Sequence, residues 1–262
     1  MSDTVLKTES LSFGVDDSCI LDGITFSAQA GERLSIIGPN GAGKSTLLRC
    51  LSGVYKSWQG EVSVFGGSIR SCSSKALART ISYVPQVAEG SVPYTVREFV
   101  LMGRYPHLSP FSSVRKNDIE VVEKAMECTG VLDFSDRLLG TLSGGERQKV
   151  YIAASMAQEA RIMLFDEPST FLDPKHQAEV LSILVDLNRK QGRTIITVTH
   201  DINTALHYSH RIIGIKEGKI VFDGDPSRLA AGRESERIYD ISFDCVAHPD
   251  SGKPVLLPKS QL

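Results

Sequence analysis

The chain has 262 residues, 41% of them hydrophobic, so it is long enough to bury one large core or two smaller ones. Its 29 basic and 31 acidic residues give a formal net charge of -2, which provides no overall attraction to nucleic acid or to anionic lipid. The 5 cysteines are odd in number and far apart, and no apolar run approaches the roughly 20 residues that span a bilayer, so we expect a soluble chain in a reducing cytosol, without a disulfide framework or a zinc site.

The first part of the chain is expected to form antiparallel strands. Residues 5–37 carry short apolar pieces separated by Asp- and Gly-containing turns, a pattern typical of strands joined by tight connections. The last apolar run, residues 34–37, is typical of a buried strand, and residues 45–51 are typical of a helix. A glycine-rich loop lies between this strand and this helix.

That loop fits the phosphate-binding pattern G-x-x-x-x-G-K-S/T at every fixed position. Its glycines let the backbone curl so that successive N–H groups point at phosphate oxygens. Lys44 supplies a positive charge for the outer phosphates, and the Ser45 hydroxyl is placed to bind Mg2+. A glycine-rich turn without a ligand is the alternative, but the flanking strand and helix favour a nucleoside-triphosphate site. This site would comprise Gly38, Pro39, Asn40, Gly41, Ala42, Gly43, Lys44, Ser45 and Thr46.

The middle of the chain changes from strand patterns to helix patterns. Residues 61–65 alternate as in a strand, and residues 81–85 are typical of a strand that a proline stops, with Gln86 just beyond its end. From about 88 to 158, apolar residues recur at helical spacing without an intervening strand, which predicts a helical subdomain. The segment 103–113, rich in proline and serine, should be a loop between two of its helices.

Strand patterns return after residue 160. Residues 161–165 and 194–198 enclose a helical span near 175–190, which predicts a parallel sheet with crossover helices. Residues 211–222 are typical of a hairpin, and the tail from about 245 is expected to be loosely structured because it contains several Pro and Gly residues.

The predicted fold class is α/β: a phosphate-loop NTPase core built on a parallel sheet, with an antiparallel β lead-in and an inserted α-helical subdomain. Residues 1–87 and 159–225 would form the ATP-binding core with its antiparallel part. Residues 88–158 would form the helical subdomain, and residues 226–262 a C-terminal extension.

Two adjacent acids follow the strand predicted just after residue 160. This strand delivers Asp166 and Glu167 to its carboxyl end, where ligands of open parallel sheets bind. Asp166 can hold Mg2+ through water, and Glu167 can orient or deprotonate the attacking water. Adjacent acids also occur in solvated loops, but a phosphate loop in the same chain favours the catalytic interpretation.

The run Leu-Ser-Gly-Gly-Glu-Arg-Gln at residues 142–148 resembles the signature of ATP-binding-cassette proteins. Ser143 and the amides of Gly144 and Gly145, at the start of a helix, could form a second anion site. This second site cannot serve the same ATP as Lys44 unless two chains face each other. The resemblance implies a head-to-tail homodimer that holds two ATP molecules between phosphate loops and signatures, whereas a plain helix N-terminus is the alternative.

Three further residues match the motifs of this family in the expected order. They are Gln86 before the helical subdomain, Asp173 after the acidic strand, and His200 after residues 194–198. The resemblance implies that Gln86 reaches Mg2+ and the attacking water, that Asp173 acts across the dimer interface, and that His200 contacts the γ-phosphate. The set of metal-binding residues would then be Ser45, Gln86 and Asp166.

One position departs from the family pattern. Proteins of this family usually stack adenine on an aromatic residue about 29 positions before the lysine, and that position is Val15 here. Phe13 is the nearest aromatic residue. Either Phe13 takes over the stacking, or phosphate contacts carry the affinity and the base is read weakly.

Shorter phrases resemble the ATPase subunits of importers for iron–siderophore complexes, haem and cobalamin; they lie at residues 102–107, 170–177 and 200–203. The resemblance implies an ATP-hydrolysing subunit at the cytoplasmic face of the membrane, with no nucleic-acid partner. This subunit would be attached to membrane permease subunits, and a substrate-binding protein would deliver the substrate to the permease. The loop 103–116, with Arg104, His107, Arg115 and Lys116, is a candidate docking surface for the permease, or else ordinary solvated charge.

Two other functions remain open at this stage. A soluble ATPase of the same family, acting in nucleic-acid maintenance or translation, usually carries a long coiled coil or a second cassette, and the sequence has neither heptads nor a second phosphate loop. A non-hydrolysing interaction module is disfavoured because Lys44, Asp166, Glu167 and His200 are all present.

Overall fold

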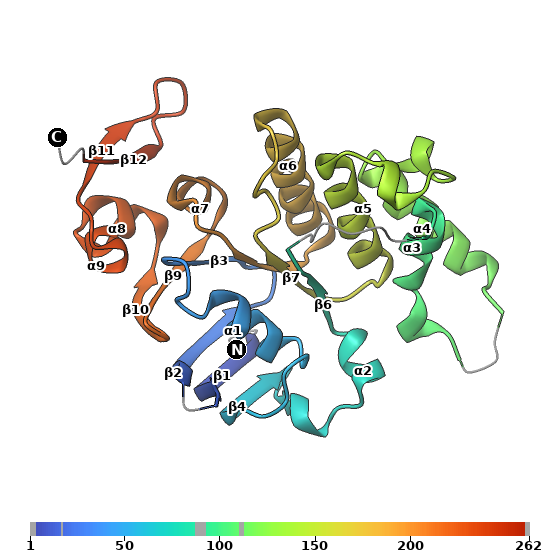
Figure 1. Ribbon diagram of the computed structural model, residues 1–262, viewed down its shortest axis with the longest axis horizontal. Helices are drawn as coiled ribbons and strands as arrows, with labels where there is room; N and C mark the ends of the chain where they lie inside the picture. Colours follow the sequence, from blue (N-terminus) through green and yellow to red (C-terminus); the bar gives the residue numbers. More distant parts are fainter. Residues whose placement is uncertain (1–3, 17, 87–92, 110–112, 260–262) are drawn as a thin grey trace. The chain divides into compact units, whose positions relative to one another are not determined.

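The computed structural model describes residues 4–16, 18–86, 93–109 and 113–259. The chain forms two compact units (Figure 1). The first contains Met1–Ser71 and Thr194–Leu262, and the second contains Cys72–Arg193. Within the described part of the chain, no helix is both long enough and apolar enough to cross a lipid bilayer.

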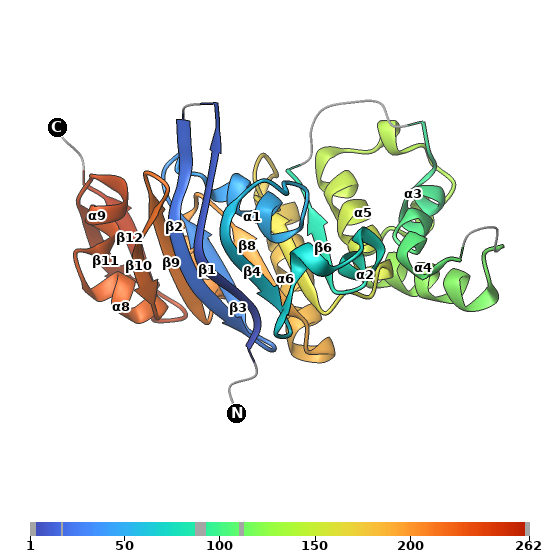
Figure 2. The same ribbon diagram turned by 90° about the horizontal axis from the view of Figure 1, so that it is seen from below.

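The predicted antiparallel lead-in is confirmed in the first unit. Its strands are β1 (Thr4–Val15), β2 (Ser18–Gln29), β4 (Gln59–Val64) and β5 (Gly67–Ser68), in the order β2-β1-β4-β5. Strands β1 and β2 form a long twisted ribbon (Figure 2). Leu6 and Leu11 of β1 are buried, so one face of this ribbon contributes to the core.

A second group of strands in the first unit carries the phosphate loop. It comprises β3 (Arg33–Ile37), β8 (Thr194–Val198), β9 (Arg211–Lys216) and β10 (Lys219–Gly224). Strand β3 runs parallel to both β8 and β9, and β9–β10 is the antiparallel hairpin predicted over 211–222. Because β3 and β8 are parallel neighbours, the segments that follow them begin at the same edge of the sheet.

The carboxyl ends of β3 and β8 lead into helices. Helix α1 (Lys44–Leu51) follows the phosphate loop, and α7 (Ile202–Tyr208) follows β8. Leu47, Leu48 and Leu51 are fully buried, which fixes the orientation of α1 and with it the start of the helix beside the loop.

The prediction of a loosely structured tail is wrong. After α8 (Pro226–Ala231) and α9 (Glu234–Tyr239), strands β11 (Phe243–Ala247) and β12 (Pro254–Pro258) pair as an antiparallel hairpin. Asn203 of α7 donates its side-chain amide to the Leu256 carbonyl at 3.0 Å and accepts from the Leu256 N–H at 2.8 Å. The Asn203 amide takes the place of a backbone partner for β12, and the buried Leu256 side chain anchors the hairpin. A composition rich in turn residues does not reveal either contact.

The second unit contains the strand that ends in the two acids. Strands β6 (Ile81–Val84) and β7 (Ile162–Asp166) pair in parallel, and all five residues of β7 are buried. The short α2 (Ser74–Ala78) precedes β6, and α6 (Pro174–Gln191) follows β7. The carboxyl ends of β6 and β7 therefore lie side by side.

Between β6 and β7, the described residues form helices, turns and one isolated bridge. Helices α3 (Val96–Met102), α4 (Lys116–Cys128) and α5 (Gly144–Ala157) enclose an apolar cluster that includes Val100 and Met126 (Figure 1). Part of the predicted loop 103–113 is a single 3-10 turn over Tyr105–His107. Helical spacing of apolar residues is the signal that predicted these helices.

The predicted docking role is wrong for Arg104. Only 3% of this residue is exposed. Its guanidinium donates to Asp118 Oδ1 at 3.0 Å, to Glu159 Oε2 at 2.6 Å and to the Ala157 carbonyl at 2.7 Å. Arg104 therefore holds α4 against the end of α5, whereas Lys116, with a side chain that is 91% exposed, remains on the surface.

Candidate active site

The phosphate loop has a backbone that only glycine fits at two positions. Gly38 has φ 151°, and a Cβ atom there would lie 2.0 Å from the Ile215 carbonyl oxygen. Gly43 has φ 96°, and its Cβ would lie 2.8 Å from the carbonyl oxygen of Ile20. Strands β2 and β9 therefore approach the loop so closely that a side chain at either glycine would displace it.

Lys44 lies over this loop and is buried. Its Nζ donates to the carbonyl oxygens of Gly38 at 2.8 Å and Pro39 at 2.9 Å. The N-cap of α1 is Gly43, which has no side chain to occupy the amides of the first turn, and that turn contains no acidic residue. The ammonium group and the helix N-terminus together form a positive environment suited to phosphate.

His200 follows β8 in the same unit. The preceding residue, Thr199, donates its N–H to the Ile36 carbonyl of β3 at 3.1 Å. The following residue, Asp201, caps α7 by accepting from the N–H groups of Asn203 and Thr204. The exposed His200 is therefore held at the sheet edge that also carries the phosphate loop.

Tyr239 of α9 is a residue near the phosphate loop that the sequence did not indicate. Its hydroxyl is buried, and burial raises the pKa of Tyr239, an effect that the nearby Gly38 N–H partly offsets. The two groups do not reach hydrogen-bonding geometry. No motif marks a lone tyrosine in a C-terminal segment, so this proximity emerges only from the packing of α9.

In the second unit, Gln86, Asp166 and Glu167 lie together at the carboxyl ends of β6 and β7. The Gln86 Nε2 donates to Glu167 Oε2 at 3.3 Å, and the Thr170 hydroxyl donates to the same oxygen at 2.9 Å. The buried Asp166 accepts from the Tyr83 hydroxyl at 3.2 Å. Glu167 itself has φ 50°, an unfavourable backbone conformation for a non-glycine residue that is typical of functional sites.

These side chains fit Mg2+ by their chemistry. Asp166 offers a carboxylate and Gln86 an amide oxygen, and hard oxygen ligands of this kind are what Mg2+ prefers. In the first unit, Ser45 offers a hydroxyl, an oxygen ligand of the same hard type. Tyr83 donates to one Asp166 oxygen, an arrangement that orients the carboxylate.

The predicted second anion site is a well-formed helix N-terminus. Ser143 caps α5, its hydroxyl accepting from the Glu146 N–H at 3.3 Å. Glu146 Oε2 accepts in return from the Ser143 N–H and hydroxyl, both at 2.8 Å, and these two bonds hold the pKa of Glu146 below its usual range. Gly144 and Gly145 occupy the first turn of α5.

Asp173 caps α6 in the same unit. Its Oδ1 accepts from the His176 N–H at 2.9 Å, and its Oδ2 lies 2.7 Å from the His176 Nδ1. The His176 N–H and then the His176 ring hold the pKa of Asp173 below its usual range. His176 was part of a family phrase but had no predicted role, because neither residue type nor spacing shows what its ring contacts.

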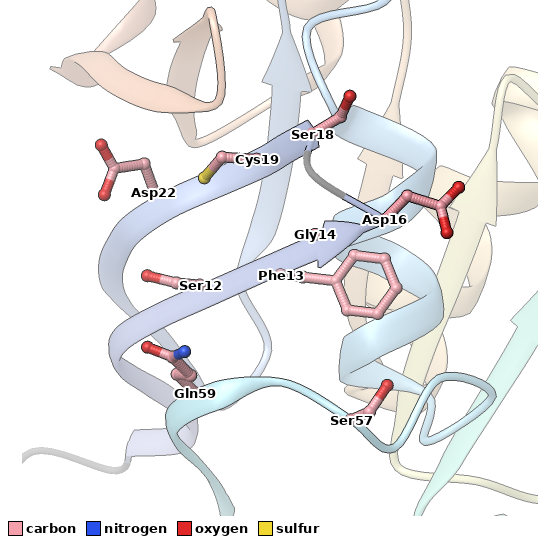
Figure 3. A pocket seen from close by; sticks show the side chains of 9 residues that line it. All are labelled: Ser12, Phe13, Gly14, Asp16, Ser18, Cys19, Asp22, Ser57 and Gln59. Carbon is pink, nitrogen blue, oxygen red and sulfur yellow. The ribbon is translucent and has the colours of Figure 1, made fainter.

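A hollow of about 490 Å3, partly lined by Phe13, lies beside the β1–β2 ribbon, and Figure 3 shows it from close by. Ser12 and Phe13, neighbours in β1, point to opposite sides of this ribbon (Figure 3). The Phe13 ring is only 6% exposed and stacks on Tyr55 with ring centroids 4.8 Å apart. Adenine could stack on Phe13 only if Tyr55 were displaced, whereas Val15 is 51% exposed.

The chain is similar to known proteins along most of its length. The profile of the ABC transporter family matches residues 21–170. The chain is 42% identical over 253 residues to the ferric enterobactin transport ATP-binding protein FepC of Escherichia coli (strain K12), covering 97% of this chain and 93% of FepC. Because the match spans nearly the full length of both proteins, it includes the C-terminal segment of this chain as well as the motifs.

Two solved structures share the fold. A metal-chelate type ABC transporter in an inward-facing conformation has a TM-score of 0.86 and 26% identity, with 99% of this chain and 98% of that chain covered. The ATP-binding cassette MJ0796, in a dimeric post-hydrolysis state bound to ADP and Pi, has a TM-score of 0.73 and 26% identity, with 84% and 98% covered. On the strength of its phosphate loop, acidic strand end, signature helix and full-length relatives, the chain belongs to the ABC transporter family, as an ATP-binding subunit with ATPase activity.

Proposed function

We propose that this chain energises the uptake of a ferric siderophore or a related metal chelate through a separate membrane permease. The observation that carries this proposal is the near full-length similarity to FepC, which is named for ferric enterobactin transport. Haem and cobalamin remain alternative cargoes for the same kind of subunit. The cargo does not touch this chain in the proposed arrangement, so the cargo class rests on similarity and not on a pocket.

The phosphate loop would bind the triphosphate of ATP. Its backbone N–H groups and the start of α1 would hold the inner phosphates, and Lys44 would exchange its bonds to the Gly38 and Pro39 carbonyls for the outer phosphates. His200, at the same sheet edge, would contact the γ-phosphate. Bound Mg2+, held by Ser45, Gln86 and Asp166, would neutralise charge on the phosphates.

Glu167 would act on the water that attacks the γ-phosphate. It would accept a proton from this water as the bond from the water oxygen to phosphorus forms and the bond to the ADP oxygen breaks. Gln86 and Thr170 both donate to Glu167 Oε2, which supports this role because they orient the carboxylate without protonating it. The products are ADP and inorganic phosphate.

The complete site would require a second copy of the chain. Ser143, Gly144 and Gly145 of one copy would meet the γ-phosphate held by the Lys44 of the other, and Asp173 would act across this interface. The first-turn amides of Gly144 and Gly145, which precede the capped Glu146 N–H, support an anion at that position. The similarity to a dimeric ADP-bound cassette supports the same arrangement.

We place the resulting dimer at the cytoplasmic face of the membrane, bound peripherally to the permease subunits. The substrate-binding protein would act on the other side and contact the dimer only through the permease. No nucleic-acid partner is proposed, since the chain is nearly neutral overall.

Reconstitution tests this proposal. The chain, its permease and its binding protein would be assembled in vesicles, and uptake of ferric siderophores, haem and cobalamin would be compared in the presence of ATP. We expect uptake of one ferric chelate, and loss of that uptake with Lys44→Ala. ATP-driven uptake of haem or cobalamin alone would reject the proposed cargo, and a chain that does not assemble with any permease would reject the importer function.

A further inference from the structure

The imidazole of His176 lies between two loops of the second unit, the loop that leads through Ser143 into α5 and the loop that leads through Asp173 into α6. The two loops have separate predicted roles. On one side, its Nδ1 lies 2.7 Å from Asp173 Oδ2. On the other side, the ring covers Gly145 so closely that a Cβ atom built there would lie 2.5 Å from both Cδ2 and Cγ of the imidazole. One ring therefore contacts both the signature helix α5 and the cap of α6.

The contact with Asp173 is stronger than helix capping requires. A capping aspartate needs one oxygen for a backbone N–H, and Asp173 Oδ1 meets that need by accepting from the His176 N–H at 2.9 Å. The His176 ring adds a second bond, to Oδ2. Because a carboxylate only accepts, Nδ1 carries the proton in this bond. The ring thus fixes the second oxygen of Asp173, which capping alone leaves free to rotate.

The contact with Gly145 fixes the other loop. Gly145 lies in the first turn of α5, next to Ser143 and Gly144, and the flat ring fits because Gly145 has no side chain. Further along, Lys149 of α5 and Glu179 of α6 form an ion pair at 2.9 Å that holds the same two helices together. That pair lies beyond the first turns. Between the loops themselves, Leu172 Cδ2 lies 3.9 Å from a Cβ atom built at Gly144, so the His176 ring makes the closer of these two contacts.

We propose that His176 is a positioning residue that holds the Ser143–Gly145 anion site and the Asp173 carboxylate in a single arrangement. This inference rests on the proposed function, because both groups act on the second copy of the chain. His176 itself need not touch ATP. A shift of either loop would misplace the amides that meet the γ-phosphate, so the residue controls formation of the ATP-bound dimer and not binding of ATP to one chain.

The test uses the Glu167→Gln chain, which is expected to hold ATP without hydrolysing it. In this background, His176→Ala should raise the dimer dissociation constant in MgATP at least tenfold, while the affinity of one chain for MgATP stays within twofold. His176→Asn should recover part of the loss, because its amide can donate to Asp173. Lys149→Ala is the matched control, since it breaks the other link between α5 and α6, and it should change the dimer constant less than threefold.

A double-mutant cycle makes the test sharper. Gly145→Ala should abolish dimerisation because its Cβ has no room beside the ring, and adding His176→Ala should restore part of it because the ring is gone. Independent effects would overturn the proposal. In that case the dimer dissociation constant of the double variant would exceed that of the parent by the product of the two single-variant increases. So would a His176→Ala chain that dimerises as well as its parent.

Hydrogen exchange on the monomer separates this inference from the proposed function. His176→Ala should speed amide exchange in both residues 142–146 and residues 171–175, with no change in the last two turns of α5. If the Glu167→Gln chain does not dimerise, the proposed sandwich fails, and the exchange rates still decide the role of His176. Exchange that speeds up in only one of the two segments, or in neither, would reject a positioning role.

Discussion

The side-chain amide of Gln86 donates to Glu167 Oε2 at 3.3 Å, which joins the residue beyond β6 to the acid beyond β7. This distance is at the long end for an N–H to oxygen hydrogen bond, so the bond is weak and is easily exchanged for another partner. The Thr170 hydroxyl holds the same oxygen more closely, at 2.9 Å. Glu167 is therefore kept in place by its own loop, while Gln86 is able to leave it for a metal ion or a water molecule.

Glu167→Gln should bind MgATP normally and hydrolyse it slower by about two to four orders of magnitude, because the amide cannot accept the proton of the attacking water. Thr170→Val removes the closer orienting bond but keeps the carboxylate, so its loss in kcat should be only about tenfold with KM unchanged. Phosphate release at saturating MgATP measures both rates. A Glu167→Gln chain that hydrolyses at the parent rate would show that the base is another group.

Lys44→Ala should weaken MgATP binding to below detection in a titration at micromolar protein. The buried ammonium group is the cation held over the phosphate loop, and the loop's backbone amides alone would have to meet the charge of the outer phosphates. Lys116→Ala removes an equal charge from an exposed position and serves as the control. Unchanged nucleotide affinity in Lys44→Ala would disprove the assignment of the site.

Arg104→Met should lower the free energy of unfolding by about 3 kcal/mol, because it leaves the buried Asp118 carboxylate without its guanidinium partner. Lys116→Met removes the same charge from the surface and should change it by less than about 0.5 kcal/mol. Chemical denaturation at neutral pH measures both. Equal effects would mean that Arg104 is ordinary surface charge.

The effect of Arg104→Met should depend on pH. Burial alone would raise the pKa of Asp118, but the Arg115 N–H and the Arg104 guanidinium hold that pKa below its usual range. In the parent, the lowered pKa of Asp118 stabilises the folded state. This stabilisation is fully present above the unfolded pKa of about 3.9 and is lost as the pH falls through the lower pKa of the folded state. Without Arg104, part of this lowering is lost and the folded pKa of Asp118 rises, so the deficit of the variant should be largest near neutral pH and should shrink toward pH 4. A deficit that is constant from pH 7 to pH 4 would contradict this account.

The sequence indicates those candidate residues whose spacing is fixed by chemistry. Gly38 and Lys44 stand out because phosphate binding demands glycine and lysine in a set order, whereas Ser143 stands out through the resemblance of residues 142–148 to the family signature. Asp166 and Glu167 stand out because they follow a residue run typical of a strand, and the structure shows this strand paired in parallel with β6.

The parts that the sequence did not predict depend on contacts between distant residues. Arg104 was assigned to the surface because its charge suggested exposure, yet Asp118 and Glu159 surround it. The composition of the tail predicts loose structure, yet Asn203 supplies the partner that β12 needs. His176 of α6 contacts Gly145 of α5, and no local pattern encodes a contact between residues so far apart in the sequence.

Base recognition is the last prediction, and it depends on Val15, Phe13 and Tyr55. The stacked pair of Phe13 and Tyr55 is closed to solvent on the Phe13 side, while Val15 exposes a small aliphatic side chain where the family has an aromatic ring. If no ring stacks on the base, ATP and GTP should bind with affinities within about threefold of each other, since both present the same triphosphate to Lys44. Val15→Tyr should then strengthen ATP binding by about 1 kcal/mol, or roughly fivefold, by supplying a stacking surface.

Phe13→Ala separates stacking from packing. Because the Phe13 ring is buried against Tyr55, the variant should lose about 3 kcal/mol or more of unfolding free energy while its affinity for ATP, measured well below its melting temperature, stays within twofold. Titrations with ATP and GTP, together with denaturation curves for the parent, Val15→Tyr and Phe13→Ala, give all of these quantities. A Phe13→Ala chain that keeps its stability but loses about 1 kcal/mol of ATP binding, with GTP binding unaffected, would mean that Tyr55 moves aside and that adenine does stack on Phe13.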